Sequence, residues 1–243
     1  MFHLEERLEF IRERVKEANA AGVIIGISGG KDSAVTTALC VKALGSEKVL
    51  GISMPCRSHP GDLEHARLVA DTFNIKFHVV DLKANYETMK DSIASQVDLE
   101  LSDIALANIK PRLRMITLYT IAQSKNYLVV GTDNLSEMVM GYFTKWGDGA
   151  YDINPLSDLT VKEVLAFGKE LGIPAPILEK APSAGLWPGQ TDEIEMGVSY
   201  DEIENYIKTG CASTEEAHSI IEKSNKRTQH KREMPYFFRP KQS

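Results

Sequence analysis

The sequence predicts an α/β fold in which helices cover both faces of a twisted parallel sheet. Short apolar runs rich in β-branched residues alternate with amphipathic helical segments through the first half of the chain. These runs lack polar alternation, which is typical of parallel strands that are buried on both faces. Strands that alternate with helices are joined by right-handed crossovers, so we expect a three-layer α/β/α arrangement.

The first half of the chain supplies the expected sheet. An amphipathic helix comes first, because apolar residues recur at helical spacing at Leu4, Leu8, Ile11, Val15 and Ala18. Strands are then expected at residues 22–27, 48–54, 75–82 and 127–131, with helices at 34–44, which Gly45 ends, and at 62–73. Residues 84–123 are helical in pattern, but Pro111 divides them into at least two helices. We expect Asn108 to cap the second helix and Pro111 to lie in its first turn, where a missing N–H costs little.

The second half of the chain is expected to contain long loops between its helices. Residues 133–154 are polar and glycine-rich, and residues 181–193 are rich in glycine and proline. Helices are expected at 160–171, which Gly172 and Pro174 close, and at 200–207 and 214–224, before a basic tail at 223–232. Long loops inside a compact protein are uncommon unless they bind something.

Composition limits the class of protein. The 243 residues, 43% of them hydrophobic, are enough to bury a sizeable core, and the net charge of −6 lacks the basic excess of a nucleic-acid-binding protein. Cys40, Cys56 and Cys211 form no CxxC pair, which disfavours a zinc site or disulfide framework and suits a reducing compartment. The charged N-terminal segment does not resemble a signal peptide, and the longest apolar stretch, residues 20–27, is too short to cross a bilayer. We therefore expect a cytoplasmic protein that does not associate with membranes.

The most informative motif is GISGGKDS at residues 26–33, between the first strand and the following helix. Ligands of open parallel sheets bind beyond the carboxyl ends of the strands. The paired glycines allow a sharp turn whose N–H groups can hold an anion, the serines add hydroxyl groups, and Asp32 could hold a divalent cation against phosphates. The motif is neither GxxxxGK[ST] nor GxGxxG, which leaves an ordinary glycine-rich turn with capping Ser and Asp as the plain alternative.

The loop resembles the pyrophosphate-binding loop of the N-type ATP pyrophosphatases, which cleave ATP between its α and β phosphates and adenylate a substrate oxygen. Further blocks occur in the order and approximate spacing of the ammonia-dependent NAD synthetases. They are NIKPRLRM at 108–115, GTDNLSE at 131–137, FTKWGDG at 143–149, PSAGL at 182–186, QTDE at 190–193 and the triplet His230-Lys231-Arg232. The resemblance implies an adenine nucleotide alpha hydrolase-like fold and a single NAD synthetase domain over residues 1–243.

The resemblance also implies the reaction. It is the ATP-dependent amidation of deamido-NAD with ammonia, which gives NAD, AMP and pyrophosphate through an acyl-adenylate and is the last step of NAD biosynthesis. ATP is then a co-substrate and Mg²⁺ the cofactor. A homodimer is implied, with the helices of residues 84–123 at its interface. Because the chain is short for an added glutaminase domain, we expect free ammonia or a separate ammonia source.

The site residues follow from the same resemblance. It implies that ATP is bound by Gly26, Ile27, Ser28, Gly29, Gly30, Lys31, Asp32, Ser33, Thr132 and Ser183. It implies that deamido-NAD is bound by Arg112, Lys145, Asp152, His230 and Lys231, and that Asp32 and Glu137 hold magnesium. Hard carboxylates suit magnesium and a guanidinium in a first helical turn suits an anion, although such residues taken alone are more often caps or solvated charges.

Three positions leave alternatives open. Many members of the family carry an ATP-contacting Lys where this chain has Val161, followed by Lys162. Neighbouring helical side chains point about 100° apart, so either Lys162 reaches ATP through a local shift or another cation serves. Asp148 is a candidate for taking a proton from ammonium, and Lys31 for neutralising charge at the transferred phosphorus. Cys56 could border the adenine pocket, but a small buried filler is the simpler interpretation.

Two other functions compete with this one. A tRNA-modifying ATP pyrophosphatase would have a net basic domain and, for thiolation, a reactive Cys or a metal-binding CxxC, which the composition disfavours. A nucleotide-binding sensor with the same sheet would need neither two separated carboxylates nor a second set of basic residues.

Overall fold

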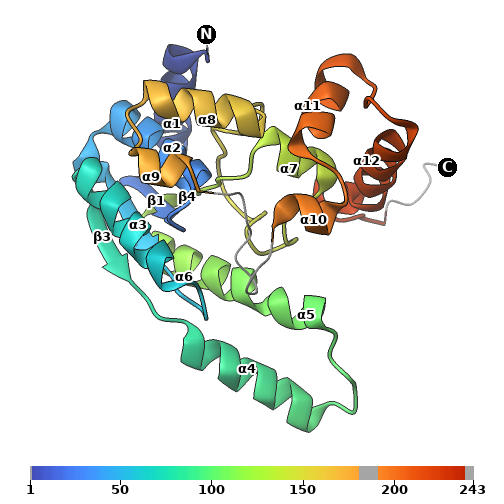
Figure 1. Cartoon of the computed structure of the whole chain (residues 1–243). Helices are drawn as coiled ribbons and strands as arrows, with labels where there is room; N and C mark the ends of the chain where they lie inside the picture. The colour runs from blue at the N-terminus through green and yellow to red at the C-terminus, as the bar shows by residue number, and fades with distance from the viewer. Residues whose placement is uncertain (1, 181–190, 239–243) are drawn as a thin grey trace, which may run out of the picture.

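The fold is built on a four-stranded sheet, which a computed structural model of residues 2–180 and 191–238 describes (Figure 1). All pairings are parallel and the strand order is β3-β2-β1-β4, so the predicted parallel sheet is confirmed. The strands are β1 (Gly22–Gly26), β2 (Val49–Ser53), β3 (Lys76–Val79) and β4 (Tyr127–Val130). The chain proceeds outward from β1 to β3 and then returns to the other side of β1. The strand order therefore reverses between β1 and β4.

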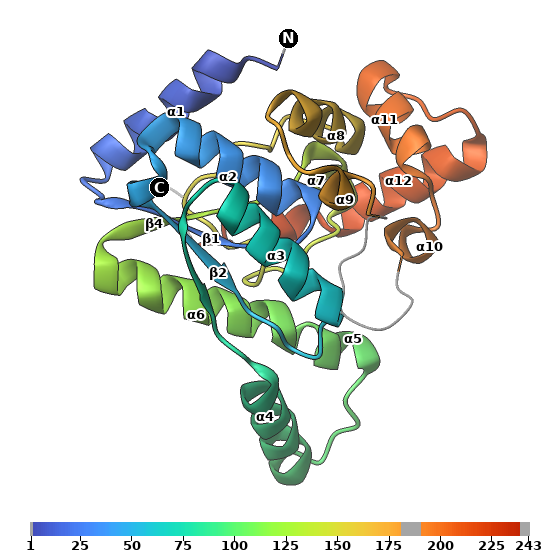
Figure 2. The same cartoon turned by 60° about the vertical axis from the view of Figure 1, so that its left-hand side comes forward.

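Helices cover both faces of the sheet, as the two views show (Figures 1 and 2). One face carries α1 (Leu4–Glu17), α2 (Lys31–Leu44), α3 (Pro60–Thr72) and α8 (Val161–Glu170), and the other carries α6 (Ile109–Lys125) with α4 (Lys83–Gln96). Side chains alternate along β1, so that Val23 and Ile25 pack into the core beneath α2 while Ile24 packs into the core beneath α6. The predicted three-layer arrangement is confirmed.

A group of helices beside the sheet forms a third apolar cluster. It joins α7 (Leu135–Met140), α11 (Tyr200–Thr209) and α12 (Glu215–Arg227) around the fully buried Ile203 and Ile221. The Ser224 hydroxyl donates to the carbonyl oxygen of Met140 at 2.9 Å, which ties α12 to the end of α7. The short helix η2 (Gln229–Lys231) follows α12, and Lys231 donates to the carbonyl oxygen of Gly141 at 2.7 Å, just beyond the end of α7.

Several elements differ from the sequence prediction. Residues 133–154 were expected to be a loop but contain α7, because Asn134 and Glu137 form a capping box and Gly141 ends the helix in the left-handed conformation. The region of residues 84–123 holds three helices, α4, α5 (Asp103–Ala107) and α6, which agrees with the prediction of at least two, and Pro111 lies in the first turn of α6 as predicted. Asn108 stands at the cap position, but the predicted side-chain cap is wrong, because its Oδ1 accepts the hydroxyl of Thr144 at 2.8 Å instead. Two short helices were not predicted: α9 (Ala175–Leu178), and α10 (Asp192–Met196), which begins within the loop expected at residues 181–193.

The helix α4 projects from the body of the molecule in both views (Figures 1 and 2). Tyr86 is its one buried residue, whereas Met89 and, beyond the helix end, Val97 and Leu99 are exposed. No helix in residues 2–180 and 191–238 combines the length and apolarity that a bilayer span requires.

A buried arginine in α1 binds residues 155–158, which lie shortly before α8. The Arg7 guanidinium donates to the carbonyl oxygen of Pro155 at 2.7 Å and to both carboxylate oxygens of Asp158 at 2.5 and 2.7 Å. The hydrogen bond from Arg7 lowers the pKa of Asp158. This clamp fixes the polypeptide that leads from the sheet to α8.

Replacing Arg7 with Met should lower the free energy of unfolding by about 2 kcal/mol, because the buried carbonyl of Pro155 loses its donor. Urea denaturation at neutral pH measures this loss. The folded-state pKa of Asp158 lies below its ordinary value of 3.8. The stabilisation that ionised Asp158 gives the folded state is therefore complete above about pH 3.8 and is lost as the pH falls through the folded-state pKa. Asp158→Asn should therefore flatten the acid limb of stability, and an unchanged acid limb would contradict the clamp.

Candidate active site

The predicted site segments meet where the carboxyl ends of β1 and β4 lie side by side. Such a reversal of strand order opens the crevice in which α/β sheets bind ligands. Residues 27–30 lead from β1 into α2, and residues 131–134 lead from β4 into α7. The second segment contacts the first turn of α2, because the Asn134 side-chain amide donates to Asp32 Oδ1 at 3.1 Å.

The loop after β1 is held in shape by its own hydrogen bonds. Ser28 Oγ accepts the N–H of Gly30 at 3.2 Å, and Ser33 Oγ accepts the N–H of Ser28 at 3.3 Å while donating to the carbonyl of Gly30 at 3.0 Å. No side chain caps α2, whose first N–H groups can therefore face an anion. Gly29 has φ +80°, and a Cβ there would overlap the carbonyl oxygen of Asp62 on α3.

Asp32 and Glu137 are two acidic residues that both hydrogen-bond to Asn134. Lys31 is buried and donates to Asp32 Oδ2 at 2.8 Å. Glu137 Oε2 accepts the N–H of Asn134 at 3.0 Å, and Asn134 Oδ1 accepts the N–H of Glu137 at 3.1 Å. Burial and the charge of Asp32 raise the pKa of Glu137 to about 8. Burial opposes the charged form of Lys31, but Asp32 and Glu137 outweigh it and raise the pKa of the lysine.

This pair of carboxylates fits a magnesium ion. Burial first, and the charge of Asp32 second, raise the pKa of Glu137, and a bound divalent cation would offset both effects. Glu137 Oε1 takes no part in the capping box, and magnesium commonly binds one or two protein carboxylates together with phosphate oxygens. Within the described part of the chain, no group of three metal-ligating side chains forms a fuller protein cage.

Two further acidic residues lie at this end of the sheet. Asp133 directly follows Thr132, is only 6% exposed, and its Oδ2 atom has no hydrogen-bond partner among the described residues. Asp148 Oδ1 accepts the N–H of Thr144 at 2.8 Å. Sequence reasoning selected Asp148 but missed Asp133, although its place directly beyond a buried strand could have drawn attention to it.

The predicted basic residues converge on a second side of the site. Arg112 donates to the carbonyl oxygen of Lys145 at 3.4 Å, and Lys145 donates to the carbonyl oxygen of His230 at 2.6 Å. Lys231 donates to the carbonyl oxygens of Gly141 and Phe143, each at 2.7 Å. Three segments far apart in the sequence, α6, the loop at 143–149 and η2, are joined in this way.

Other predicted residues have structural partners of their own. Asp152 accepts the N–H of Val129 at 2.7 Å and the hydroxyl of Tyr119 at 3.2 Å, which fixes it beside β4. Lys162 pairs with Asp201 at 2.9 Å and Glu204 at 3.2 Å, both on α11. The ion pairs of Lys162 thus direct it to α11 and not to the loop after β1.

Part of the prediction falls outside the described residues. Ser183, the whole PSAGL block and Gln190 lie there. The described end of the QTDE block is anchored, because Asp192 Oδ2 accepts the hydroxyl of Tyr200 at 2.8 Å and Glu193 accepts the N–H of Tyr200 at 2.7 Å. Cys56 is fully buried and its thiol donates to the carbonyl of Leu82 at 3.7 Å, which agrees with a filler role.

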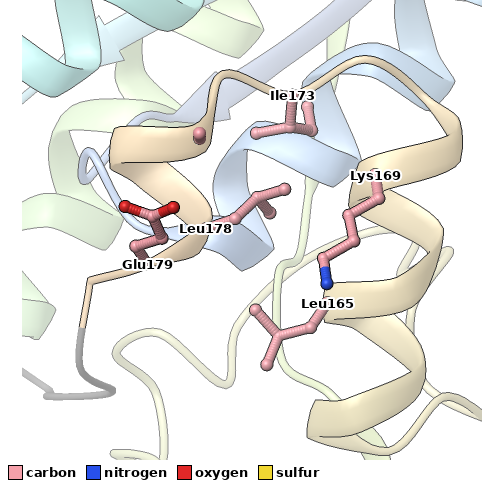
Figure 3. A pocket seen from close by; sticks show the side chains of 6 residues that line it. Leu165, Lys169, Ile173, Leu178 and Glu179 are labelled. Carbon is pink, nitrogen blue, oxygen red and sulfur yellow. The ribbon is translucent and has the colours of Figure 1, made fainter.

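A hollow between α8 and α9 contains none of these residues (Figure 3). It is lined by Leu165, Lys169, Ile173, Ala175, Leu178 and Glu179. Its lining is mainly aliphatic and lacks the convergent polar groups of the crevice at β1 and β4.

Gly29→Ala should abolish measurable ATP binding and lower stability, because the new methyl group must displace the backbone of α3. Gly172→Ala is the matched control, since Gly172 has φ +77° but nothing lies within 4 Å of its added Cβ. Backbone strain alone should cost the control about 1 kcal/mol and leave ATP binding intact. Calorimetric titration with ATP and urea denaturation separate the two effects, and equal losses in both variants would contradict the packing role.

The chain matches known proteins along nearly its whole length. A family model described as NAD synthase matches residues 3–235. The NH(3)-dependent NAD(+) synthetase of Carboxydothermus hydrogenoformans is 48% identical over 231 residues, which cover 95% of this chain and 94% of the relative. A structure of NMN synthetase from Francisella tularensis has a TM-score of 0.90 at 38% identity and 96% coverage of each chain. An NH3-dependent NAD synthetase structure from Campylobacter jejuni has a TM-score of 0.78 at 28% identity and 97% coverage of each chain. The chain therefore belongs to the NAD synthase family.

Proposed function

We propose that this chain catalyses the ATP-dependent amidation of deamido-NAD with ammonia, giving NAD, AMP and pyrophosphate. The observation that carries the proposal is that Asn134 holds Asp32 and Glu137 together next to the loop at residues 27–30, at the reversal of strand order. The near-complete match to NH(3)-dependent NAD(+) synthetases supports the choice of a carbon–nitrogen ligase over other ATP pyrophosphatases. The proposed unit is a single domain acting in the cytoplasm, with ammonia taken up free or from a separate source.

The chemistry requires an activated carboxylate. Ammonia does not displace oxide from a carboxylate, so the nicotinate group of deamido-NAD first attacks the α phosphate of ATP and releases pyrophosphate. Ammonia then attacks the acyl carbon and AMP leaves. Since anionic reactants must approach each other, positioning and charge neutralisation should supply most of the rate enhancement.

The residues divide this work between two sides of the crevice. The N–H groups of the loop at residues 27–30, with Ser28, Ser33 and Thr132, are proposed to bind the phosphates of ATP. The buried Lys31 would neutralise charge at the transferred phosphorus. Arg112, Lys145, Asp152, His230 and Lys231 are proposed to hold deamido-NAD. The anchoring of Arg112, Lys145, His230 and Lys231 around the loop at 143–149 supports this role, and Asp152 is fixed beside β4. Lys162 is not proposed as an ATP ligand, because α11 supplies both of its ion-pair partners.

Mg²⁺ is the proposed cofactor, held by Asp32 and Glu137. When bound it would neutralise phosphate charge and orient the α phosphate. The chain's own contribution is the capping box, which fixes the Glu137 carboxylate in the crevice before any ligand arrives.

A mononucleotide substrate is the second candidate. The NMN synthetase of Francisella tularensis superposes on this chain with a higher TM-score than the NAD synthetase of Campylobacter jejuni. The chemistry would be the same, with nicotinate mononucleotide replacing deamido-NAD. Purified protein should be assayed with ATP, Mg²⁺ and ammonium on each substrate, with AMP and amidated product followed together. A higher kcat/KM for the mononucleotide would reassign the substrate, and the absence of AMP with both would refute the proposed chemistry.

A homodimer is also proposed, with α4, α5 and α6 at its interface. Large apolar side chains on and beside these helices are exposed, namely Met89, Val97, Leu99, Ile104 and Ile116. Monomeric proteins rarely expose apolar residues in such numbers on one region.

Glu137→Gln should reduce AMP formation by about 100-fold or more, because it removes one charge from the proposed magnesium site. Glutamine still completes a capping box, so the fold should survive. Glu163→Gln is the matched control, since Glu163 forms the same box with Thr160 at the start of α8. Wild-type turnover in the Glu137 variant, or an equal loss in both variants, would contradict the assignment.

Ile116→Glu should convert the proposed dimer into a monomer, because the charge would be buried in the interface. Ile116 is 53% exposed in the single chain. Ile194→Glu, at a residue on α10 that is 81% exposed, serves as the control and should leave the mass unchanged. Light scattering after size-exclusion chromatography measures the mass, and a monomeric wild type would refute the dimer.

A further inference from the structure

Lys180 lies beside the loop at residues 27–30, although it comes from a distant part of the chain. Its ammonium group donates to Oδ1 of Asp62, in the first turn of α3, at 2.6 Å. The backbone carbonyl of Asp62 packs in turn against Gly29, because a Cβ built on Gly29 would lie 2.3 Å from that oxygen. Asp62 therefore joins the Lys180 ammonium to the loop.

A second set of contacts places Lys180 near the start of α2. The helix α9 ends at Leu178, shortly before Lys180, and packs against α2 and α8 (Figure 2). Leu178 and Val35 of α2 meet at Gly168, since a Cβ built there would lie 2.7 Å from the first side chain and 3.2 Å from the second. Lys180 is thereby held close to the end of α2 whose N–H groups have no side-chain cap.

Water reaches the ion pair between Lys180 and Asp62. The lysine side chain is 34% exposed and the aspartate side chain is 21% exposed. Ion pairs of this kind contribute little to stability, so Lys180 can turn toward another anion at small cost. An ammonium group also has three N–H donors, so it can bind a phosphate oxygen while it keeps its contact with Asp62.

Two other lysines of the predicted ATP site have different partners. Lys31 donates to Asp32, on the side of the proposed magnesium ion, and Lys162 pairs with Asp201 and Glu204 on α11. Magnesium offsets only part of the negative charge of a triphosphate. A further cation beside the loop at residues 27–30 would therefore stabilise the bound nucleotide.

The position of Lys180 also fits the direction of the proposed reaction. In-line displacement at phosphorus places the attacking and leaving oxygens on opposite sides. The proposed deamido-NAD ligands Arg112 and Lys145 lie around α6, which covers one face of the sheet. The helices α2 and α3 cover the other face, and α9 packs on α2 (Figure 2). A substrate held around α6 would thus direct the leaving group toward α3 and α9.

We propose that Lys180 binds the β and γ phosphates of ATP and that Asp62 is its positioning residue. This inference rests on the proposed function and adds a cation that the function leaves unassigned. In the adenylation step the nicotinate oxygen forms a bond to the α phosphorus. The bond from that phosphorus to the bridging oxygen breaks, with its electron pair on pyrophosphate. Lys180 stays protonated and stabilises the charge that pyrophosphate gains.

Lys180→Met tests the proposal, because methionine keeps much of the length of the side chain and removes its charge. We expect the Kd for pyrophosphate and the KM for ATP each to rise by at least about tenfold, the effect of losing one charge-assisted contact. The Kd for AMP, which lacks both phosphates, should stay within about twofold of the wild type. Lys162→Met is the matched control, since it also breaks ion pairs and should change none of these constants.

Asp62→Asn separates a binding role of Lys180 from a structural one. It breaks the same ion pair but keeps the ammonium group, so the Kd for pyrophosphate should stay within about threefold of the wild type. If the ion pair served only to hold α3 to the end of α9, the Asp62 and Lys180 variants would lose pyrophosphate affinity equally. That result would overturn the inference.

The wild-type protein offers a test that does not depend on folding of a variant. Lysine acylation followed by mass spectrometry reports how freely each ammonium group reacts. At about ten times its Kd, magnesium pyrophosphate should slow the acylation of Lys180 about tenfold, because only the free protein reacts. AMP should leave Lys180 as reactive as before, and neither ligand should protect Lys162. Equal protection of Lys180 by both ligands, or by neither, would overturn the inference.

The outcomes separate this inference from the proposed function. A wild type that forms no AMP from ATP, deamido-NAD and ammonium refutes the function itself. An active wild type whose Kd for pyrophosphate and KM for ATP are unchanged in Lys180→Met refutes only the assignment of Lys180. Calorimetric titration with magnesium pyrophosphate measures the first constant without any turnover, so the two results are obtained independently.

Discussion

Unbalanced negative charge at the carboxyl end of the sheet is the constraint on which the rest of the site depends. Asp32, Asp133, Glu137 and Asp148 lie at one end of β1 and β4, and burial raises the pKa of Asp133 and of Glu137. Lys31 is the cation that directly bonds to this group among the described residues. Carboxyl groups with raised pKa values cluster at functional sites, and here the proposed magnesium ion would offset their charge beside the phosphates of ATP.

The neutral part of the site keeps this charge in place. Asn134 is fully buried and contacts Asp32 with its amide N–H, Glu137 with its amide oxygen, and the Glu137 carboxylate with its backbone N–H. One side chain therefore sets the separation of two acids that lie in the first turns of α2 and α7, the helices that follow β1 and β4. The basic residues are set in a similar way, through backbone carbonyl groups of the loop at 143–149 and of η2.

The sequence predicted what local patterns encode and missed what depends on distant partners. The strands, the loop after β1 and the long helices follow from apolar runs and periodicity, and the structure confirms them. The helix α7 was missed although Asn134 and Glu137 stand at capping-box spacing, because the surrounding polar and glycine residues favoured a loop. The hydrogen bond between Thr144 and Asn108 could not be predicted, since it joins residues 36 positions apart. Asp133 had no signature of its own, because its significance lies in the absence of a partner after folding.

The capping box at Glu137 would also influence which ion the proposed metal site accepts. Its Oε2 atom is already engaged by the N–H of Asn134, so the side chain offers a metal one free oxygen. Calcium favours high coordination numbers and often takes both oxygens of a carboxylate, whereas magnesium prefers single oxygens in an octahedral shell. A helix cap, whose usual effect is on stability, would in this position make the site discriminate between the two commonest divalent cations of the cell.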